Sequence, residues 1–340
     1  MLELTISAET EEPRDCKICA TKNAGFNYGV QSCNSCKMFF RRALDTSKMI
    51  TCKKEENCNI LDPEGSKCRF CRFHKCVLVG MKFIDSPQDP SAIINDLLHK
   101  DWTRNQHFLT GKAASTVKFK DIFERGVFLF EKKSEDTVFD FYEWGVMNHL
   151  TCINFETSLS FMKYLSKSDL TCVLKSSHLL YMIFVTAWRS YTAKKEFMCH
   201  PDGSDIFPSE VEPSAYNEKL INEIRCYLLS CLICLRVTEE EFLLLGVIIV
   251  CNPGIPDLSQ TGRMLLASYQ SMYGQTLQRY CSFKYGSNAG ALRYLEIISL
   301  STAIARCHSA IANFSTLFPI HQPQHVKVNL FTEILAFLIK

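Results

Sequence analysis

Glycine and proline are scarce in this sequence of 340 residues, with 14 and 11 copies. Because 47% of the residues are hydrophobic and 22% charged, the composition excludes a fibrous repeat and a wholly disordered chain. The longest apolar run, residues 242–251, has about half of the roughly 20 residues that a membrane-spanning helix needs. The acidic first residues lack the basic start and apolar stretch of a secretory signal. We therefore expect an intracellular protein of roughly two folded domains with no membrane segment.

Charge is unevenly distributed along the chain. The whole sequence has a formal net charge of +2, from 38 Lys and Arg against 36 Asp and Glu. Residues 16–81 contain 12 of the basic residues and 5 of the acidic ones, so their net charge is +7 and that of all other residues is −5. This pattern indicates a basic N-terminal module that binds nucleic acid, followed by a larger and mildly acidic domain.

The 18 cysteines are divided in the same way. Nine lie between Cys16 and Cys76, and nine are spread from Cys152 to Cys307. In an intracellular protein a dense cluster favours metal ligands over disulfides. Core packing explains the scattered set most simply, including the CLIC pair that ends at Cys234, because free cysteine is among the most buried residue types.

Eight of the clustered cysteines have the spacing of two zinc sites. The first four form two C-x2-C pairs separated by thirteen residues, and the next four form a C-x5-C and a C-x2-C pair separated by nine. Eight thiolates fill two tetrahedral coordination shells with no open position, which predicts two structural zinc ions. The predicted ligands are Cys16, Cys19, Cys33 and Cys36 in the first site and Cys52, Cys58, Cys68 and Cys71 in the second.

The two cysteine segments resemble the DNA-binding domain of a nuclear hormone receptor. All eight ligand positions match, as does the extra Cys76, and FNYGVQSCNSCKMFFRR is similar in particular to the large nematode branch of that family. The resemblance implies a zinc DNA-binding domain over residues 13–81, a hinge over residues 82–115 and a helical ligand-binding domain over residues 116–340. The expected fold class is a small α zinc module followed by an all-α, three-layer helical domain.

A helix that starts inside the first zinc site is the predicted reader of DNA. Residues 34–45 contain no Gly or Pro, and their two phenylalanines are expected to pack inward. Lys37, Arg41 and Arg42 would then face solvent, and the major groove admits one such helix. The resemblance assigns base contacts to Lys37 and Arg42 and a backbone contact to Arg41.

Three further positions of this helix discriminate between DNA half-sites in the family. They are occupied here by Asn34, Ser35 and Met38. Asn34 favours a bidentate pairing with adenine, whereas an acidic residue would accept from cytosine N4. The preferred half-site is therefore left open.

The second cysteine set surrounds another amphipathic helix, CRFCRFHKC, whose phenylalanines are expected to pack on the first helix. Arg69, Arg72 and Lys75 would support it and contact phosphate. The KKEEN loop of the second zinc site is where the family builds a dimer contact on DNA, and its five residues do not decide whether this chain does so.

The rest of the sequence predicts a hinge and then an all-helical domain. Residues 82–115 contain two prolines and one short possible helix, IINDLLHK, and six later segments place apolar residues three and four apart. Several segments start with caps such as Ser168-Asp169 or Thr238, and two look apolar all round, so they must lie between other helices. The six segments are residues 139–155, 169–192, 214–235, 239–251, 262–281 and 291–318.

Such a domain resembles the ligand-binding domain of the same family. FMKYLSKSDLTCVLK matches the signature around its third to fifth helices, with Phe161, Leu165, Asp169 and Leu174 at the matching positions. Near the C-terminus, LFTEIL fits the activation-helix pattern, and a plain amphipathic helix packed on the core is the alternative. The residues assigned to the activation helix are Leu330, Phe331, Glu333, Ile334 and Leu335.

In the family, a glutamate of the activation helix and a lysine at the end of the third helix hold the two ends of a partner helix. Glu333 matches the glutamate. Counting back five residues from Phe161 places Glu156 at the lysine position, a charge reversal that predicts weak binding of conventional coactivator helices. Lys163 and Lys175 are alternative cations for that role.

No catalytic constellation competes with this interpretation, because the nine histidines are dispersed and neither a phosphate-binding glycine loop nor a Gly-x-Ser-x-Gly turn occurs. The sequence predicts a nuclear, zinc-dependent transcription factor that binds specific double-stranded DNA and is not an enzyme. The implied partners are a small lipophilic ligand, a homodimer or heterodimer partner and coregulator proteins, with no membrane. Two alternatives are a receptor-like DNA-binding scaffold whose helical domain binds proteins without ligand, and a zinc redox enzyme with exposed, low-pKa thiols.

Overall fold

The computed structural model describes residues 15–22, 24–46, 50–61, 68–82, 89–114, 130–134, 136–207, 211–325 and 329–339. These residues form two compact units. The first contains the clustered cysteines, and the second is built mainly from residues 88–340. Each unit is described on its own.

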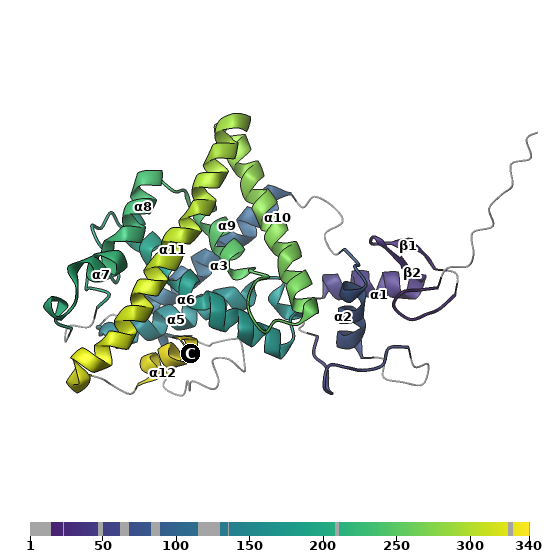
Figure 1. Cartoon of the computed structure of the whole chain (residues 1–340), viewed down its shortest axis with the longest axis horizontal. Helices are drawn as coiled ribbons and strands as arrows, with labels where there is room; N and C mark the ends of the chain where they lie inside the picture. Colours follow the sequence, from purple (N-terminus) through teal and green to yellow (C-terminus); the bar gives the residue numbers. More distant parts are fainter. Residues whose placement is uncertain are drawn as a thin grey trace, which may run out of the picture. The chain divides into compact units, whose positions relative to one another are not determined.

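The first unit contains a β-hairpin and two helices (Figure 1). These elements are β1 Gly25–Asn27, β2 Val30–Ser32, α1 Asn34–Asp45 and α2 Arg69–Leu78. Tyr28 and Gly29 form the two-residue turn of the hairpin with φ values of 54° and 80°. A type I′ turn requires positive φ at both positions, which is why a glycine follows the tyrosine.

Helices α1 and α2 share one small core. Phe40 of α1 and Phe73 of α2 are buried and stack with their ring centroids 5.6 Å apart, which confirms the predicted inward packing. Gly80 ends α2 with φ 96°, and the amides of Gly80 and Met81 donate to the carbonyls of Val77 and Cys76. This is a Schellman motif, and the buried Met81 supplies its apolar contact.

The second unit is mostly helical, and all six segments that were predicted to be helical contain helices. The helices are α3 Pro90–Thr110, α5 Phe141–Ser158, α6 Lys167–Thr192, α7 Glu218–Asn222, α8 Leu228–Leu235, α9 Glu239–Val250, α10 Gln260–Tyr285, α11 Ser287–His321 and α12 Leu330–Ile339. A π-helical turn, Glu223–Tyr227, joins α7 to α8, and short 3-10 turns lie at Met162–Tyr164, Pro213–Ala215 and Pro323–His325. A single small hairpin, β3 Gly111–Ala113 with β4 Phe130–Lys132, interrupts the all-α pattern in the described part of this unit.

The helices of the second unit are arranged in three layers, as predicted (Figure 1). Helices α6 and α9 form the middle layer, with α3 and α5 on one side and α8 and α11 on the other. In helix α9 the six residues after Glu241, five apolar ones and a glycine, are buried in succession, so the helix has no polar face for water to cover. Among the described helices, only α6 is long and apolar enough to cross a bilayer, and 61% of its most apolar window is buried inside this unit.

Helix α3 occupies most of the segment that was predicted to be a hinge. The short helix expected at residues 93–100 is present, but it extends over Pro90–Thr110. Asp89 caps the helix, Pro90 occupies its first turn, and the helix packs on α5 and α9. Its buried stripe consists of Leu97, Asp101, Arg104 and Phe108. Two of the four are charged and form a buried ion pair at 2.7 Å, so the stripe has no apolar period in the sequence.

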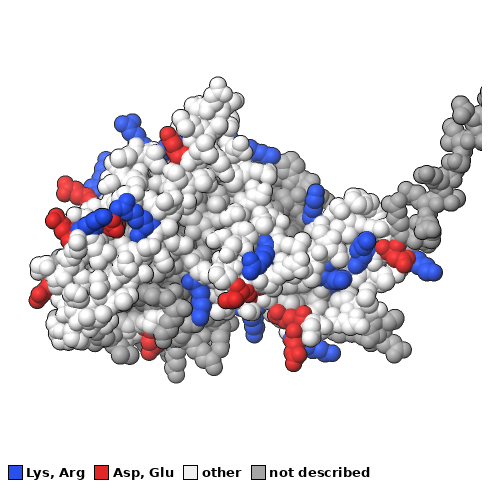
Figure 2. Space-filling model, in the orientation of Figure 1, with Lys and Arg blue, Asp and Glu red and all other residues white. Residues whose placement is uncertain are grey.

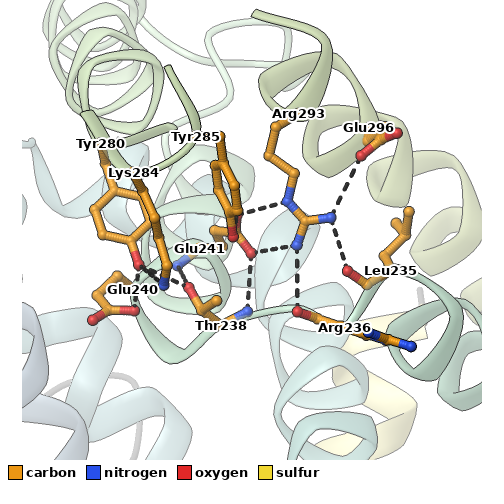
Figure 3. Close-up of polar contacts among 10 residues, drawn as sticks. All are labelled: Leu235, Arg236, Thr238, Glu240, Glu241, Tyr280, Lys284, Tyr285, Arg293 and Glu296. Carbon is orange, nitrogen blue, oxygen red and sulfur yellow. Dashed lines mark hydrogen bonds and ion pairs between the residues drawn. The ribbon is translucent and has the colours of Figure 1, made fainter. Parts of the chain in front are cut away.

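A buried ion pair joins α9 to α11 (Figure 3). The Glu241 carboxylate is fully buried and accepts from Arg293 Nε at 2.8 Å and Nη2 at 2.7 Å, while Arg293 Nη1 donates to the carbonyl of Leu235. Glu241 also completes the capping box with Thr238, which the sequence predicted. Because the guanidinium of Arg293 binds both carboxylate oxygens of Glu241, the pair fixes the N-terminal end of α9 against α11.

Two smaller expectations were wrong. The N-cap of α6 is Ser166, whose hydroxyl accepts from the amide of Asp169, and not Ser168. The scattered cysteines are only partly core residues: Cys152, Cys251, Cys281 and Cys307 are buried, but Cys234 of the CLIC pair is exposed.

Candidate zinc centres, DNA-reading helix and ligand cavity

The eight predicted ligands form two separate clusters of four sulfur atoms. Within each cluster all the Sγ atoms lie within 4.8 Å of one another. The Sγ atom of Cys19 lies 3.6 Å from those of Cys33 and Cys36, and that of Cys52 lies 3.7 Å from Cys58 and 3.8 Å from Cys71. A tetrahedron with Zn–S bonds of about 2.3 Å has edges of about 3.8 Å, so both clusters fit four-coordinate zinc.

The first cluster also starts α1. Cys33 is the N-cap residue of α1, and its Sγ accepts from the amide of Cys36 at 3.4 Å. The N-terminal end of the helix is therefore tied to the metal ligands. Burial raises the pKa of the Cys36 thiol, so its thiolate depends on nearby positive charge.

Arg72 supplies part of that charge. Its Nη2 lies 3.2 Å from Cys36 Sγ, and its guanidinium lies 4.6 Å from the ring centroid of Phe39. Arg72 therefore orients a zinc ligand and covers the α1 core. The sequence did not predict this contact, because the two residues are 36 positions apart.

The predicted DNA-reading residues lie on one helix with a buried inner face. Phe39, Phe40 and Ala43 are buried. Of the six α1 residues that were singled out, Met38 is half-buried. The other five are exposed: Asn34, Ser35, Lys37, Arg41 and Arg42. Figure 2 shows Lys and Arg side chains on the visible face of the first unit, together with a few acidic ones.

The two other basic residues singled out in α2 differ in exposure. Arg69, at the start of α2, is exposed, whereas Lys75 is half-buried. The KKEEN loop is exposed along its whole length, with Glu56 at φ 59°.

The helical unit contains a cavity of about 460 Å³ between α5, α6, α11 and α12. Apolar side chains form most of its wall, for example Leu179, Ile183 and Phe314. Its polar lining groups are few, and they include His149 and Thr186. Apolar cavities of this size with a few placed polar groups are typical small-molecule sites.

Helix α12, the predicted activation helix, closes this cavity. Phe331, Thr332 and Ala336 belong to its lining. Ile334 is fully buried against Leu150 and Ile153 of α5, with Leu330 packed beside them. The helix starts after Asn329, whose side-chain Oδ1 accepts from the Thr332 amide and whose own amide donates to the Thr332 hydroxyl.

The outward side of α12 carries Glu333, which is exposed as predicted. The Leu335 side chain lies outside the part of the chain that the structure describes. Lys175 of α6 is exposed, and Lys163 lies over the ring of Tyr164.

Glu156 does not occupy the position predicted for it. Its side chain is fully buried in α5 and lies 3.2 Å from Nδ1 of His178. The predicted charge reversal at a coactivator surface is therefore wrong, because a buried carboxyl cannot repel a docked helix. Counting residues back from a motif did not reveal which side of α5 this position faces.

The signature residues of the helical unit are part of its core. Phe161, Leu165, Asp169 and Leu174 are all buried around the start of α6.

Two cavity features were not predicted. Gly145 lets Phe331 approach α5, and His200 stacks on Trp144 with its ring at 11° to the indole.

The first unit combines two four-cysteine centres with a basic helix, and the same chain contains a three-layer helical unit with a cavity. Together these features define a zinc-dependent DNA-binding protein with a ligand-binding domain. Comparison with known families agrees. A double treble clef zinc finger of the C4 type matches residues 14–83, and the ligand-binding domain of nuclear hormone receptors matches residues 129–319.

The chain belongs to the nuclear hormone receptor family and is a DNA-binding transcription factor of that type. It is 37% identical to nuclear hormone receptor family member nhr-27 of Caenorhabditis elegans over 95% of this chain and 93% of that protein. It is 32% identical to family member nhr-9 of the same species, over 98% of this chain and 99% of that protein. These matches confirm the nematode-type resemblance.

Proposed function

We propose that α1 enters the major groove of a specific DNA half-site and that the helical unit binds a small lipophile and coregulator proteins. The observation that carries the DNA part is the exposed basic face of α1, formed by Lys37, Arg41 and Arg42 opposite a buried apolar face. Because the N-cap of this helix is a predicted zinc ligand, bound zinc holds that face in place.

The proposed roles along α1 differ from residue to residue. Lys37 and Arg42 donate to guanine O6 and N7, while Arg41, together with Arg69 of α2, holds phosphates. Asn34 and Ser35 lie in the exposed first turn and set the preference for neighbouring bases, with adenine favoured by Asn34.

In vitro selection of double-stranded DNA by the zinc-loaded full chain tests the DNA part. We expect one enriched motif that disappears after chelation, and two copies at fixed spacing if the protein binds as a dimer. Enrichment of no motif, or of the same motif after chelation, contradicts the proposal.

The cavity supports ligand binding over the scaffold alternative. Since three residues of α12 line it, a bound molecule would contact the proposed activation helix directly. Exposed Glu333 is then available to accept from the free amides of a coregulator helix. Native mass spectrometry of the purified chain separates the two candidates, because only the ligand-binding function predicts a co-purified small molecule.

We further propose that the protein acts in the nucleus by binding and not by catalysis. The DNA-binding domain spans residues 13–81, and the helical domain begins at α3 and not at residue 116. The packing of α3 on α5 and α9 supports this boundary.

A further inference from the structure

Three ionisable side chains form a hydrogen-bonded chain inside the helical unit. His149 Nδ1 lies 2.9 Å from His178 Nε2, and His178 Nδ1 lies 3.2 Å from Glu156 Oε2. All three side chains are fully buried. The chain thus joins α5 to α6 at two points, through residues that the proposed DNA-binding and activation functions do not use.

One end of this chain reaches the cavity. His149 is a lining residue of the cavity, and it packs against Phe331 of α12 with ring centroids 5.6 Å apart. Its Nε2 is buried and has no hydrogen-bond partner among the described residues. A buried polar nitrogen without a partner is costly, so this atom indicates a missing ligand group.

The chain is uncharged. Burial lowers the pKa of His178 to about 3 and lowers that of His149, while it raises the pKa of Glu156. In addition, no Lys, Arg, Asp or Glu is among the described residues that line the cavity. A charged ligand would therefore lose its hydration without gaining an opposite charge.

Two proton arrangements satisfy both hydrogen bonds of the neutral chain. In the first, Glu156 Oε2–H donates to His178 Nδ1, His178 Nε2–H donates to His149 Nδ1, and His149 Nε2 carries a proton toward the cavity. In the second, His149 Nδ1–H donates to His178 Nε2, His178 Nδ1–H donates to Glu156 Oε2, and the carboxyl proton is on Oε1. Each arrangement contains three protons, one for each neutral group.

The partners of Glu156 Oε1 decide between the two arrangements. This atom is buried and has no partner among the described residues. In the first arrangement it is a carbonyl oxygen, and in the second it is a hydroxyl donor. Each arrangement leaves one donor unpaired: His149 Nε2–H on the cavity wall in the first, and Glu156 Oε1–H, away from the cavity lining, in the second. Because an orphaned buried donor is rare in proteins and a ligand can pair only the donor at the cavity, the first arrangement is favoured. His149 then presents an N–H donor to the cavity.

We propose that the cavity takes an uncharged lipophile bearing a carbonyl oxygen, and that the Nε2–H of His149 donates a hydrogen bond to this oxygen. His178 and Glu156 are positioning residues that hold His149 in this tautomer. The inference rests on the proposed ligand-binding function and specifies its ligand class.

The probe for the test is 2-undecanone, compared with undecanoate, which has the same chain length and a negative charge. Titration calorimetry of the zinc-loaded full chain is expected to give binding of the ketone and at least about tenfold weaker binding of the carboxylate. His149→Phe keeps an aromatic ring but removes the donor, and it should weaken ketone binding by about tenfold. His149→Gln retains an N–H donor and should keep most of the affinity.

The tautomer is measured independently of any ligand, by NMR of the full chain labelled with 15N-histidine. We expect the His149 proton on Nε2 in the parent, and a mixture of tautomers in His178→Phe, in which the fixing hydrogen bond is lost. Circular dichroism and thermal melting confirm that each variant is folded, and Ser176→Ala, at an exposed position of α6, is the control for substitution in that helix.

The outcomes separate this inference from the proposed function. A proton on Nδ1 in the parent, equal ketone binding by the parent and His149→Phe, tighter binding of undecanoate, or no ketone binding at all would each overturn the carbonyl anchor. A different small molecule co-purifying with the chain would still support the ligand-binding function.

Discussion

The ring of Phe331 in α12 packs directly over Gly145 in α5. A Cβ atom at Gly145 would lie 2.5 Å from Phe331 Cδ2 and 2.6 Å from Cε2, closer than any normal carbon contact. The closed position of the terminal helix therefore depends on one residue without a side chain, which lies on the cavity wall.

Gly145→Ala is expected to displace α12. The substitution would otherwise favour α5 by up to about 1 kcal/mol, since alanine is the better helix former. We expect faster hydrogen exchange in residues 330–339, measured by mass spectrometry. The matched control is Gly274→Ala in α10, where the added Cβ would meet only the Tyr294 hydroxyl at 3.6 Å. Equal exchange in α12 of the parent and Gly145→Ala would contradict the importance of this contact.

Arg72→Met is expected to weaken zinc binding in the first site. The variant loses the hydrogen bond to Cys36 Sγ while keeping much of the apolar cover over Phe39. Loss of a group that orients a metal ligand typically costs about 10- to 100-fold in metal affinity. Competition with a chromophoric chelator measures this loss. Arg69→Met, at an exposed position of the same helix, should leave the affinity unchanged, and an equal loss in both variants would rule out the specific contact.

Lys37→Ala and Arg41→Ala should affect DNA binding in different ways. Loss of a base contact from Lys37 should cost about 1–3 kcal/mol and relax the preference at one base pair. Loss of a phosphate contact from Arg41 should weaken binding to all sequences alike and lower the salt slope by about one. Binding to a library of single-base variants of the selected site measures both effects. The same uniform loss for the two variants would refute the assigned roles.

Asn34→Glu extends this test within α1. An acidic side chain in the exposed first turn accepts from cytosine N4, so the preference should move away from adenine at one position. An unchanged motif would show that Asn34 contacts no base.

Arg293→Met should strongly destabilise the helical unit. The variant leaves the fully buried Glu241 carboxylate without its cation, which typically costs about 3–5 kcal/mol. Urea unfolding followed by circular dichroism measures the loss. Glu241→Leu combined with Arg293→Met should recover part of it, because no unpaired charge is then buried. Arg306→Met, which breaks an exposed pair with Glu223, is the control and should have a much smaller effect.

The zinc centres and most helices of the second unit were predictable from the sequence, because their causes are local. Two cysteines separated by two residues can both bind one metal ion, and the apolar period of α6 or α9 reports the burial of that helix directly. The capping box of Thr238 and Glu241 is likewise contained within four residues. Family resemblance then supplied the identity of the two domains, and the comparisons confirmed it.

Tertiary structure decided which polar residues are buried. Helix α3 was taken for a hinge because two of its four buried residues are the charged pair Asp101 and Arg104, whose burial depends on their mutual contact. Glu156 was predicted on a coactivator surface, but it is buried beside His178, 22 positions along the chain. The hydrogen bond between Arg72 and Cys36, which lie 36 positions apart, was likewise not predicted. The sequence shows where charged residues lie along the chain, but not which of them are buried. The free energy of burying a charge depends on its contacts with segments that are distant in the sequence.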